Sequence, residues 1–422
     1  MTSDQLDERP GANDHDADLP GWNDDPGAPI VPNTSELDTA NFVGRASETE
    51  RALTVLADGQ NLILRDPRRM GKTFWLARLA EEAATTGRLH VVMIDYQHVT
   101  SVEDFLLTTA DHLLRDPGLP GGFRQSLKAF FDNTEVALGS GPLRLKKAVA
   151  NLPAIQTLEH VFSRLDDAIR TEKTVSWVIA MDEVPDAILS IAGGGQAADG
   201  RNLLHSLRHL RMTMPHIRWI LAGSTGFHHA LAACADTTAP LNDLSHFPFG
   251  PLGLADTVRL ARRLALGIGR PITRQAVIAT AKATDGIPWL VQALFAHLRW
   301  DKANQPMTSQ ITAEDVATAL DDLIEDRDQS GDLTYFVDRL DQYYHADDLR
   351  LARQILDWAA DTDEPHPLSD LPGEIRRHQR FRAVLDNLID DHYLASAEHG
   401  ARLTWRYRIL RIVYRRRTQR DG

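Results

Sequence analysis

Short apolar runs alternate with longer amphipathic stretches through the middle of this chain. The apolar runs predict strands at residues 61–65, 89–96, 175–181, 217–222 and 246–249. Between them, apolar residues recur three and four positions apart, which predicts helices at residues 72–84, 102–114, 157–170 and 201–214. Such alternation is typical of a mostly parallel sheet with helices on both faces. We therefore expect an α/β core with a five-stranded parallel sheet at residues 41–250.

The pattern changes in the last part of the chain. Residues 254–323 show only helical periodicity, and we expect a helical lid domain at residues 251–345. Two predicted helices, at 368–377 and 380–390, precede two predicted strands at 393–396 and 402–406. Helices followed by a hairpin indicate a winged helix, which we place at residues 346–422.

Charge is distributed unevenly along the chain. The 422 residues carry a net charge of −13, and the first 40 contain ten acids against one arginine. This segment is rich in Asp, Pro and Gly, so it lacks the apolar surface needed to offset the entropy of ordering it. We expect a disordered acidic leader at residues 1–40; the alternative is an acidic strip that folds back onto the basic tail or onto a phosphate site. Residues 401–422 are the opposite, with eight arginines against one aspartate.

The composition excludes several classes of protein. A hydrophobic share of 43% and a charged share of 25% are ordinary for a globular protein. No apolar run approaches the roughly 18 residues that cross a bilayer, and the start of the chain lacks the basic and apolar regions of a secretory signal. We therefore expect a cytoplasmic protein without a membrane contact. The single cysteine, Cys234, excludes an intrachain disulfide and a cysteine-based zinc site.

The segment between the first predicted strand and the first predicted helix has the chemistry of a phosphate-binding loop. It matches the pattern Gly-x-x-x-x-Gly-Lys-[Ser/Thr] at Gly71, Lys72 and Thr73. Backbone N–H groups and the dipole at a helix start favour an anion there. We expect Gly71 to let the backbone approach the phosphates, Lys72 to reach their oxygens, and Thr73 to ligate Mg²⁺.

The first position of this pattern holds Asp66 instead of glycine. A carboxylate about 4 Å from a phosphate would be repelled by roughly 4 kcal/mol at an effective dielectric constant of about 20. Either the side chain points away, or the arginines at positions 65, 68 and 69 offset its charge. For the loop taken alone, a chance Gly-Lys-Thr at a helix start is the alternative.

Two acids end the third predicted strand, about 110 residues after the loop: Asp182 and Glu183. A carboxylate at such a strand end can hold Mg²⁺, and the next can activate the attacking water. We assign Asp182 to the metal and Glu183 to the general base; the alternative is a helix start where acids merely suit the dipole. Ser224, after the fourth strand, either senses the γ-phosphate or the water, or caps the next helix.

These motifs occur in the order of a known group of proteins. The order is Phe-Val-Gly-Arg at 42–45, the loop, Met-Asp-Glu-Val-Pro at 181–185, Ala-Gly-Ser-Thr-Gly at 222–226 and Gly-Ile-Pro at 286–288. The chain resembles the archaeal-type ATPases of the STAND branch of P-loop NTPases, which are relatives of the AAA+ and origin-recognition ATPases.

This resemblance implies ATP and Mg²⁺ as cofactors, with slow hydrolysis that moves the winged helix as a regulatory switch in stress signalling or defence. Val43 and Arg45 would lie beside the adenine, and Pro288 would close over it from the lid. The other nucleotide contacts would be Pro67, Arg68, Arg69, Met70, Gly71, Lys72, Thr73 and Phe74. The catalytic residues would be Lys72, Asp182, Glu183 and Ser224, with Thr73 and Asp182 as metal ligands.

Two other functions stay open. Arginines of the winged helix would suit DNA phosphates in an ATP-gated DNA-binding protein related to origin-recognition factors. Acids at 386, 390 and 391 would repel DNA, however, and favour docking within the molecule or on a protein partner. In the second alternative, Asp66 has ended hydrolysis and ATP stabilises a scaffold.

Several residues outside these motifs complete the analysis. The oligomeric state is open, and Arg208 and Arg211 are candidates for an arginine finger in a self-associating form. His228 and His229 are sequence neighbours that do not share a helix face, so we expect no joint metal site from them.

Overall fold

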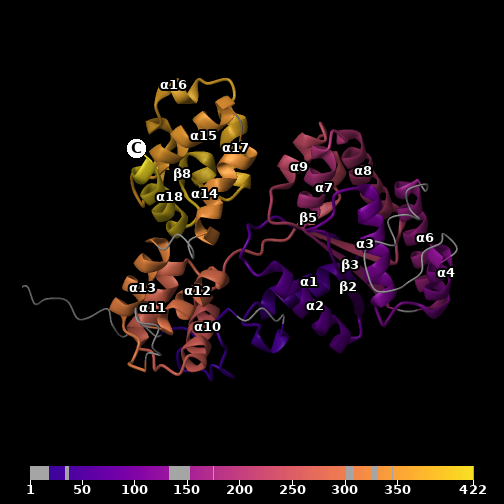
Figure 1. Ribbon diagram of the computed structural model, residues 1–422, viewed down its shortest axis with the longest axis horizontal. Coiled ribbons are helices and arrows are strands. Elements are labelled where there is room, and N and C mark those ends of the chain that lie inside the picture. The colour runs from indigo at the N-terminus through magenta and orange to yellow at the C-terminus, as the bar shows by residue number, and fades with distance from the viewer. Residues whose placement is uncertain are drawn as a thin grey trace, which may run out of the picture.

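The computed structural model describes residues 19–33, 38–132, 153–173, 175–300, 308–325, 331–344 and 346–421. It contains an α/β unit, a helical unit and a C-terminal unit, and the last two lie beside each other on one side of the α/β unit (Figure 1). The parts of the expected acidic leader at residues 1–18 and 34–37 lie outside the described residues.

The α/β unit has the parallel five-stranded sheet that the sequence predicts. The strands are β1 (Asn61–Leu64), β2 (Leu89–Asp95), β3 (Ser176–Asp182), β4 (Ile217–Ala222) and β5 (Leu244–His246). Their order is β2-β3-β4-β1-β5, with every neighbouring pair parallel. The carboxyl ends of β1, β3 and β4 therefore meet at one edge of the sheet, where the candidate site lies.

The fifth strand differs from the prediction of 246–249. It ends at His246 although Phe247 and Phe249 are buried, because Pro248 between them has no N–H to donate to the sheet. Its first residues, Leu244 and Ser245, carry no continuous apolar signal.

Helices cover both faces of this sheet. Alternate strand residues point to opposite faces, so Leu62 and Leu64 join one buried cluster with Trp75 of α2, while Ile63 joins another. The helices of the unit are α1 (Ala46–Ala57), α2 (Lys72–Thr86), α3 (Val102–Arg115), α4 (Gly121–Asp132), α6 (Ala154–Glu172), α7 (Val184–Gly193), α8 (Ala197–Thr213) and α9 (Phe227–Ala233). The cluster around Ile63 contains side chains of α3, α6, α7 and α8.

The helical unit lies within the range where we expected a lid. It consists of α10 (Leu254–Gly267), α11 (Arg274–Thr284), α12 (Pro288–Leu298) and α13 (Ala313–Glu325). Residues 19–33, which we expected to be disordered, instead pack on α10. Leu19 and Ile30 are buried, and the Ile30 N–H bonds the Arg263 carbonyl at 3.0 Å. The few apolar side chains of this segment are scattered among polar residues and produce no sequence period, so this contact was not predicted.

The C-terminal unit combines helices with a small antiparallel sheet of order β6-β8-β7. Its elements are α14 (Gly331–Tyr343), α15 (Ala346–Ala359), β6 (His366–Pro367), α16 (Gly373–Arg376), α17 (Phe381–Asp390), β7 (Leu394–Ala397), β8 (Arg402–Trp405) and α18 (Arg408–Asp421). Because α14 packs on α15 and α18, this unit begins before the expected boundary at 345–346. The helix expected at 368–377 shortens to α16, since Pro372 disfavours helix at the residue before it.

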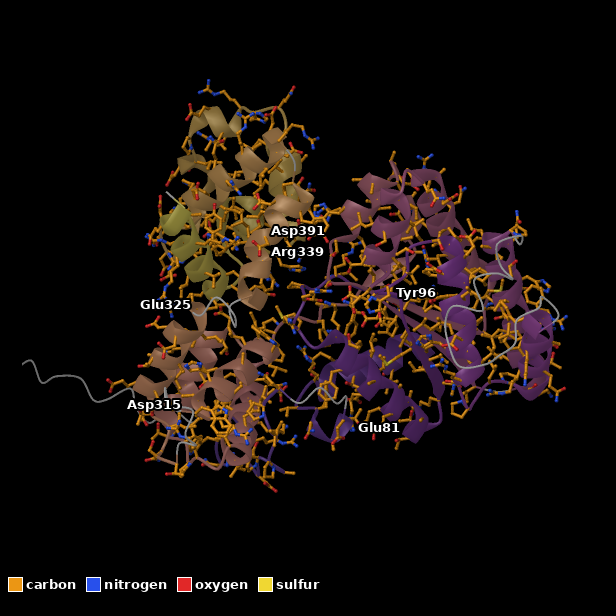
Figure 2. All side chains as sticks on the ribbon, viewed as in Figure 1. Glu81, Tyr96, Asp315, Glu325, Arg339 and Asp391 are labelled. Carbon is orange, nitrogen blue, oxygen red and sulfur yellow. The ribbon has the colours of Figure 1, made fainter. Side chains whose placement is uncertain are left out.

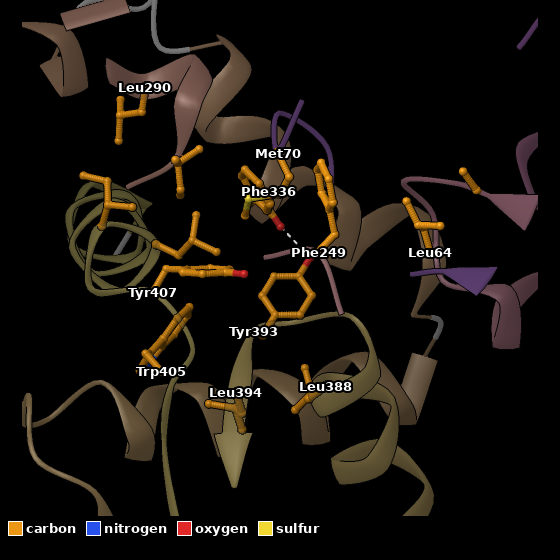
Figure 3. Packing of buried hydrophobic residues seen from close by; sticks show 14 of the residues in the cluster. Leu64, Met70, Phe249, Leu290, Phe336, Leu388, Tyr393, Leu394, Trp405 and Tyr407 are labelled. Carbon is orange, nitrogen blue, oxygen red and sulfur yellow. Dashed lines mark hydrogen bonds between the residues drawn. The ribbon is translucent and has the colours of Figure 1, made fainter. Parts of the chain in front are cut away.

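One buried cluster joins the C-terminal unit to the α/β unit. Met70 and Phe249 lie in it together with Tyr393, Trp405 and Tyr407 of the C-terminal unit (Figure 3). Met70 belongs to the phosphate-binding loop, so the C-terminal unit packs directly behind the candidate site.

Candidate functional site

The loop between β1 and α2 presents a helix start to open space. Gly71 caps α2 with φ +82°, a conformation that favours glycine, and a Cβ atom there would meet nothing within 4 Å. The first backbone N–H groups of α2 have no partner within the helix and can receive an anion.

Lys72 turns back into this loop. Its Nζ donates to the carbonyls of Asp66 and Pro67, the latter at 2.8 Å. Burial lowers the pKa of Lys72, while the charges of Glu183 and Asp182 act against that shift. The ammonium group is thus held by neutral carbonyls that an anion can replace.

Asp66 faces away from the open side of the loop. Its carboxylate accepts hydrogen bonds from the N–H groups of Phe249, at 3.3 Å, and Gly250, at 2.9 Å. The guanidinium of Arg45 bonds the carbonyls of the same two residues, at 2.8 and 2.7 Å. Asp66 therefore fixes the segment after β5, because its carboxylate is directed to the backbone amides there.

The proposed metal ligands lie side by side. The Thr73 hydroxyl donates to Oδ2 of Asp182 at 2.6 Å, across the gap between α2 and the end of β3. Burial raises the pKa of Asp182, and the Thr73 hydrogen bond opposes this. A hydroxyl and a carboxylate oxygen are the hard ligands that Mg²⁺ takes beside phosphate oxygens, so the donor set fits this ion.

Ser224 holds Glu183 in place through hydrogen bonds. The Ser224 N–H donates to Oε2 of Glu183 at 3.0 Å, and the Ser224 hydroxyl lies 2.9 to 3.0 Å from both carboxylate oxygens. Burial raises the pKa of Glu183, but its hydrogen bond with Asp186, the charge of Lys72 and the Ser224 donors lower it below its usual value. Glu183 is therefore held as a carboxylate, the form that a general base needs.

Asp186 and Thr225 extend this cluster. Burial, with the hydrogen bond and charge of Glu183, raises the pKa of Asp186 to about 6. The Thr225 hydroxyl donates to Oδ1 of Asp186 at 2.8 Å and lies 3.2 Å from the Tyr343 hydroxyl of α14. The site is thus connected to the C-terminal unit through hydrogen-bonding side chains.

Two solved structures resemble the chain along most of its length. A Walker-type ATPase of Pyrococcus abyssi is 17% identical, with a TM-score of 0.60, over 89% of this chain and 96% of that one. The ORC2 protein of Aeropyrum pernix, in ADPNP–ADP complexes, is 12% identical, with a TM-score of 0.50, over 93% of this chain and 97% of that one. This chain has the P-loop ATPase fold.

At these identities the likeness concerns the fold, which does not by itself fix a function. No family model and no curated protein matches the sequence. None of the helices in the described part of the chain has the length and apolar character to span a bilayer.

The residues expected at the adenine lie where the α/β unit meets the helical unit. Val43 is buried, and Arg45 directs its guanidinium to the carbonyls after β5 and to Met70 rather than to open space. Burial lowers the pKa of Arg45 to about 10. Pro288 is the first residue of α12, at the junction of the two units. Their contact with a base stays a prediction.

Of the remaining loop residues, some are buried and the others contact side chains of neighbouring elements. Met70 and Pro67 are buried, so only their backbone can contact a ligand. Arg68 Nε lies 3.3 Å from the Ser224 hydroxyl, and Arg69 lies over the Trp289 ring of α12 at 5.0 Å. Phe74 contacts Phe42 edge-on, with ring centroids 5.4 Å apart.

Sequence reasoning and structure differ on three residues. Arg211 is bound by both Asp243 oxygens, at 2.6 and 2.9 Å, and is buried, so it is not exposed as an arginine finger would be. Asp186 and Tyr343 were not predicted. Asp186 gave one signal, a third acid three residues after Glu183. Tyr343 gave none, because its role depends on a contact with a residue 118 positions away in the chain.

Proposed function

We propose that the protein is an ATP-binding P-loop ATPase that acts as a nucleotide-dependent regulatory switch of the STAND type. The observation that carries this proposal is the connected set of side chains from the loop to the C-terminal unit. Thr73 contacts Asp182, Ser224 clamps the neighbouring Glu183, and Thr225 contacts Tyr343. A change at the phosphate site therefore has a direct route to α14.

ATP binding begins with Lys72. Its ammonium group exchanges the carbonyls of Asp66 and Pro67 for phosphate oxygens, and the amides at the start of α2 surround the phosphates. Thr73 and Asp182 would hold Mg²⁺, which neutralises phosphate charge. The ORC2 protein with this fold was solved with ADPNP and ADP, which supports a nucleotide as the ligand.

Hydrolysis requires Glu183 to leave Ser224 and orient a water molecule. Its two hydroxyl contacts and one amide contact must be exchanged, so we expect slow turnover. This exchange also frees the segment that carries Thr225. We propose that the C-terminal unit is a winged helix whose contact with this segment loosens when ATP is bound, in a stress or defence response.

The test is ATP affinity and phosphate release for the natural protein and two variants. Lys72→Ala should weaken ATP binding by roughly 100-fold, because one charge-assisted contact to phosphate is lost in a buried site. Glu183→Gln should keep ATP affinity and lower phosphate release by roughly 100-fold. Lys282→Ala and Glu81→Gln, at residues away from the loop, are the matched controls.

Two outcomes of these measurements would contradict parts of the proposal. If Lys72→Ala changes neither quantity, the loop is not an ATP site. If Glu183→Gln retains affinity and leaves phosphate release unchanged, the protein is a scaffold that ATP stabilises.

A further inference from the structure

Two histidines and an aspartate from different units meet at one point. His228 and His229 lie in the first turn of α9, and Asp391 follows α17. The Nε2 atom of His229 is 2.9 Å from Oδ2 of Asp391, and that of His228 is 3.6 Å from the same oxygen. Although the two histidines are sequence neighbours, their rings lie together at this helix start, with centroids 4.0 Å apart.

In the described part of the chain, the surroundings leave one candidate ligand atom, Nε2 of His228, without a hydrogen-bond partner. Nε2 of His228 and Oδ1 of Asp391 are buried without a hydrogen-bond partner among the described residues. Buried polar atoms without a partner require an explanation such as an ion or water. Gly226 leaves the space for this arrangement, since a Cβ there would lie 2.4 Å from the His228 ring and 2.8 Å from Oδ1 of Asp391.

We propose that His228, His229 and Asp391 bind a divalent transition-metal ion of the zinc type, with water as the fourth ligand. The three ligand atoms lie within 4.8 Å of one another. Tetrahedral zinc with bonds of about 2.1 Å places its ligand atoms about 3.4 Å apart. The two distances to the Asp391 oxygen, 2.9 and 3.6 Å, lie on either side of this value, and the two histidine nitrogens, within 4.8 Å of each other, would close to about this spacing around the ion. Two imidazoles favour zinc over Mg²⁺ and Ca²⁺, which prefer oxygen.

Neighbouring groups fit this assignment. The Tyr344 hydroxyl donates to Oδ2 of Asp391 at 2.7 Å and fixes the carboxylate. The buried Arg339 reaches the other oxygen, Oδ1, at 3.7 Å, so it leaves the histidine-facing oxygen to the metal. Figure 2 shows Arg339 and Asp391 together, on the side of the C-terminal unit that faces α9. The ion would join the C-terminal unit to the α/β unit.

The test uses the whole protein without nucleotide, in excess Mg²⁺, titrated with Co²⁺ as a spectroscopic substitute and then with Zn²⁺. We expect one Co²⁺ per chain with visible absorption bands, displaced by Zn²⁺. His228→Gln should weaken binding at least about tenfold. It is the mildest change, because the His228 side chain is 21% exposed whereas that of Asp391 is 2% exposed. His205→Gln is the matched control, since His205 pairs with Asp236 at 2.8 Å elsewhere in the α/β unit.

The proposal fails if the natural protein binds no stoichiometric Co²⁺ or Zn²⁺, or if His228→Gln binds as tightly as the His205→Gln control. Circular dichroism of each variant shows that the fold is retained. Metal binding should persist in Lys72→Ala, so this result does not depend on whether the loop binds ATP.

Discussion

Asp66 stands where the loop motif has glycine, and its side chain is accommodated by backbone hydrogen bonds. Its carboxylate accepts two backbone N–H groups and lies near the buried Arg45, on the side of the loop away from the open helix start. We therefore expect Asp66→Ala to lower the free energy of unfolding by about 2 kcal/mol, because it leaves two amides without an acceptor. Urea unfolding measures this, and Asp58→Ala, at an exposed aspartate after α1, is the control.

ATP affinity distinguishes this role from the alternative. The folded Asp66→Ala protein should bind ATP about as tightly as the natural protein. Tighter binding at unchanged stability would mean that the carboxylate faces the phosphates.

Asp186 gives a second prediction at the residue scale, on how the stability of the protein depends on pH. Burial and the neighbouring Glu183 raise its pKa from 3.8 to about 6. The folded protein thus holds this proton more tightly than the unfolded chain, and its stability falls as pH rises between these values. Asp186→Asn removes this loss and can still accept from Thr225. We expect its melting temperature to exceed that of the natural protein at pH 7.5, with a smaller gain at pH 5.

The control for this measurement is Asp361→Asn, at an exposed aspartate, which should melt like the natural protein at both pH values. An Asp186→Asn protein whose gain is equal at pH 5 and 7.5 would show that Asp186 does not titrate in this range.

At the scale of elements, the sequence predicts what is local. Strands β1 to β4 lie within one or two residues of the predicted ranges, because each is a continuous apolar run between polar residues. The loop and the acids after β3 were also predictable, since each sits within one strand-to-helix connection. The end of β5 depends on Pro248 and on Asp66, which is 183 residues away from Phe249. Long-range partners of this kind leave no periodic signal.

The contact between α14 and the segment after β4 is a long-range contact of this kind. Its contribution to stability can be predicted and measured. Tyr343→Phe removes the hydroxyl that lies 3.2 Å from that of Thr225. In a double-mutant cycle with Thr225→Val, we expect a coupling energy of about 1 kcal/mol in urea unfolding. The control is Tyr414→Phe, whose hydroxyl bonds Asp357 within the C-terminal unit. The free-energy changes of Tyr414→Phe and Thr225→Val should be additive. If those of Tyr343→Phe and Thr225→Val are additive as well, the contact between the two hydroxyls is ruled out.

For the whole molecule, the pairing of arginines with acids affects how strongly the protein can bind DNA. Arg380 makes two contacts with Asp348, at 3.1 and 2.7 Å, and Arg416 and Arg417 pair with Asp321 and Asp338. These arginines are neutralised within the protein, so few counterions would be released on DNA binding. We expect weak binding to duplex DNA with little dependence on salt, measured by fluorescence anisotropy at two salt concentrations. A steep salt dependence that Arg380→Ala reduces would favour the DNA-binding alternative.

The position of the C-terminal unit is the property that a nucleotide switch must change. This unit contacts the loop through His392, whose Nε2 lies 2.9 Å from the Arg65 carbonyl, and contacts the segment after β4 through Tyr343. We expect both contact points to move when Lys72 and Glu183 turn to the nucleotide, and the unit to move away from α8. Dyes on cysteines at Met212 and Arg382 can report this, since those side chains are exposed and the native Cys234 is buried.

We expect lower energy transfer between these dyes when a non-hydrolysable ATP analogue and Mg²⁺ are added, and recovery with ADP. A dye pair at Asp58 and Met212, both within the α/β unit, should not change. Lys72→Ala should abolish the response, because the loop then lacks the cation that draws the phosphates in. Equal energy transfer in all nucleotide states, with ATP affinity intact, would leave a P-loop ATPase whose C-terminal unit is a fixed part of the fold.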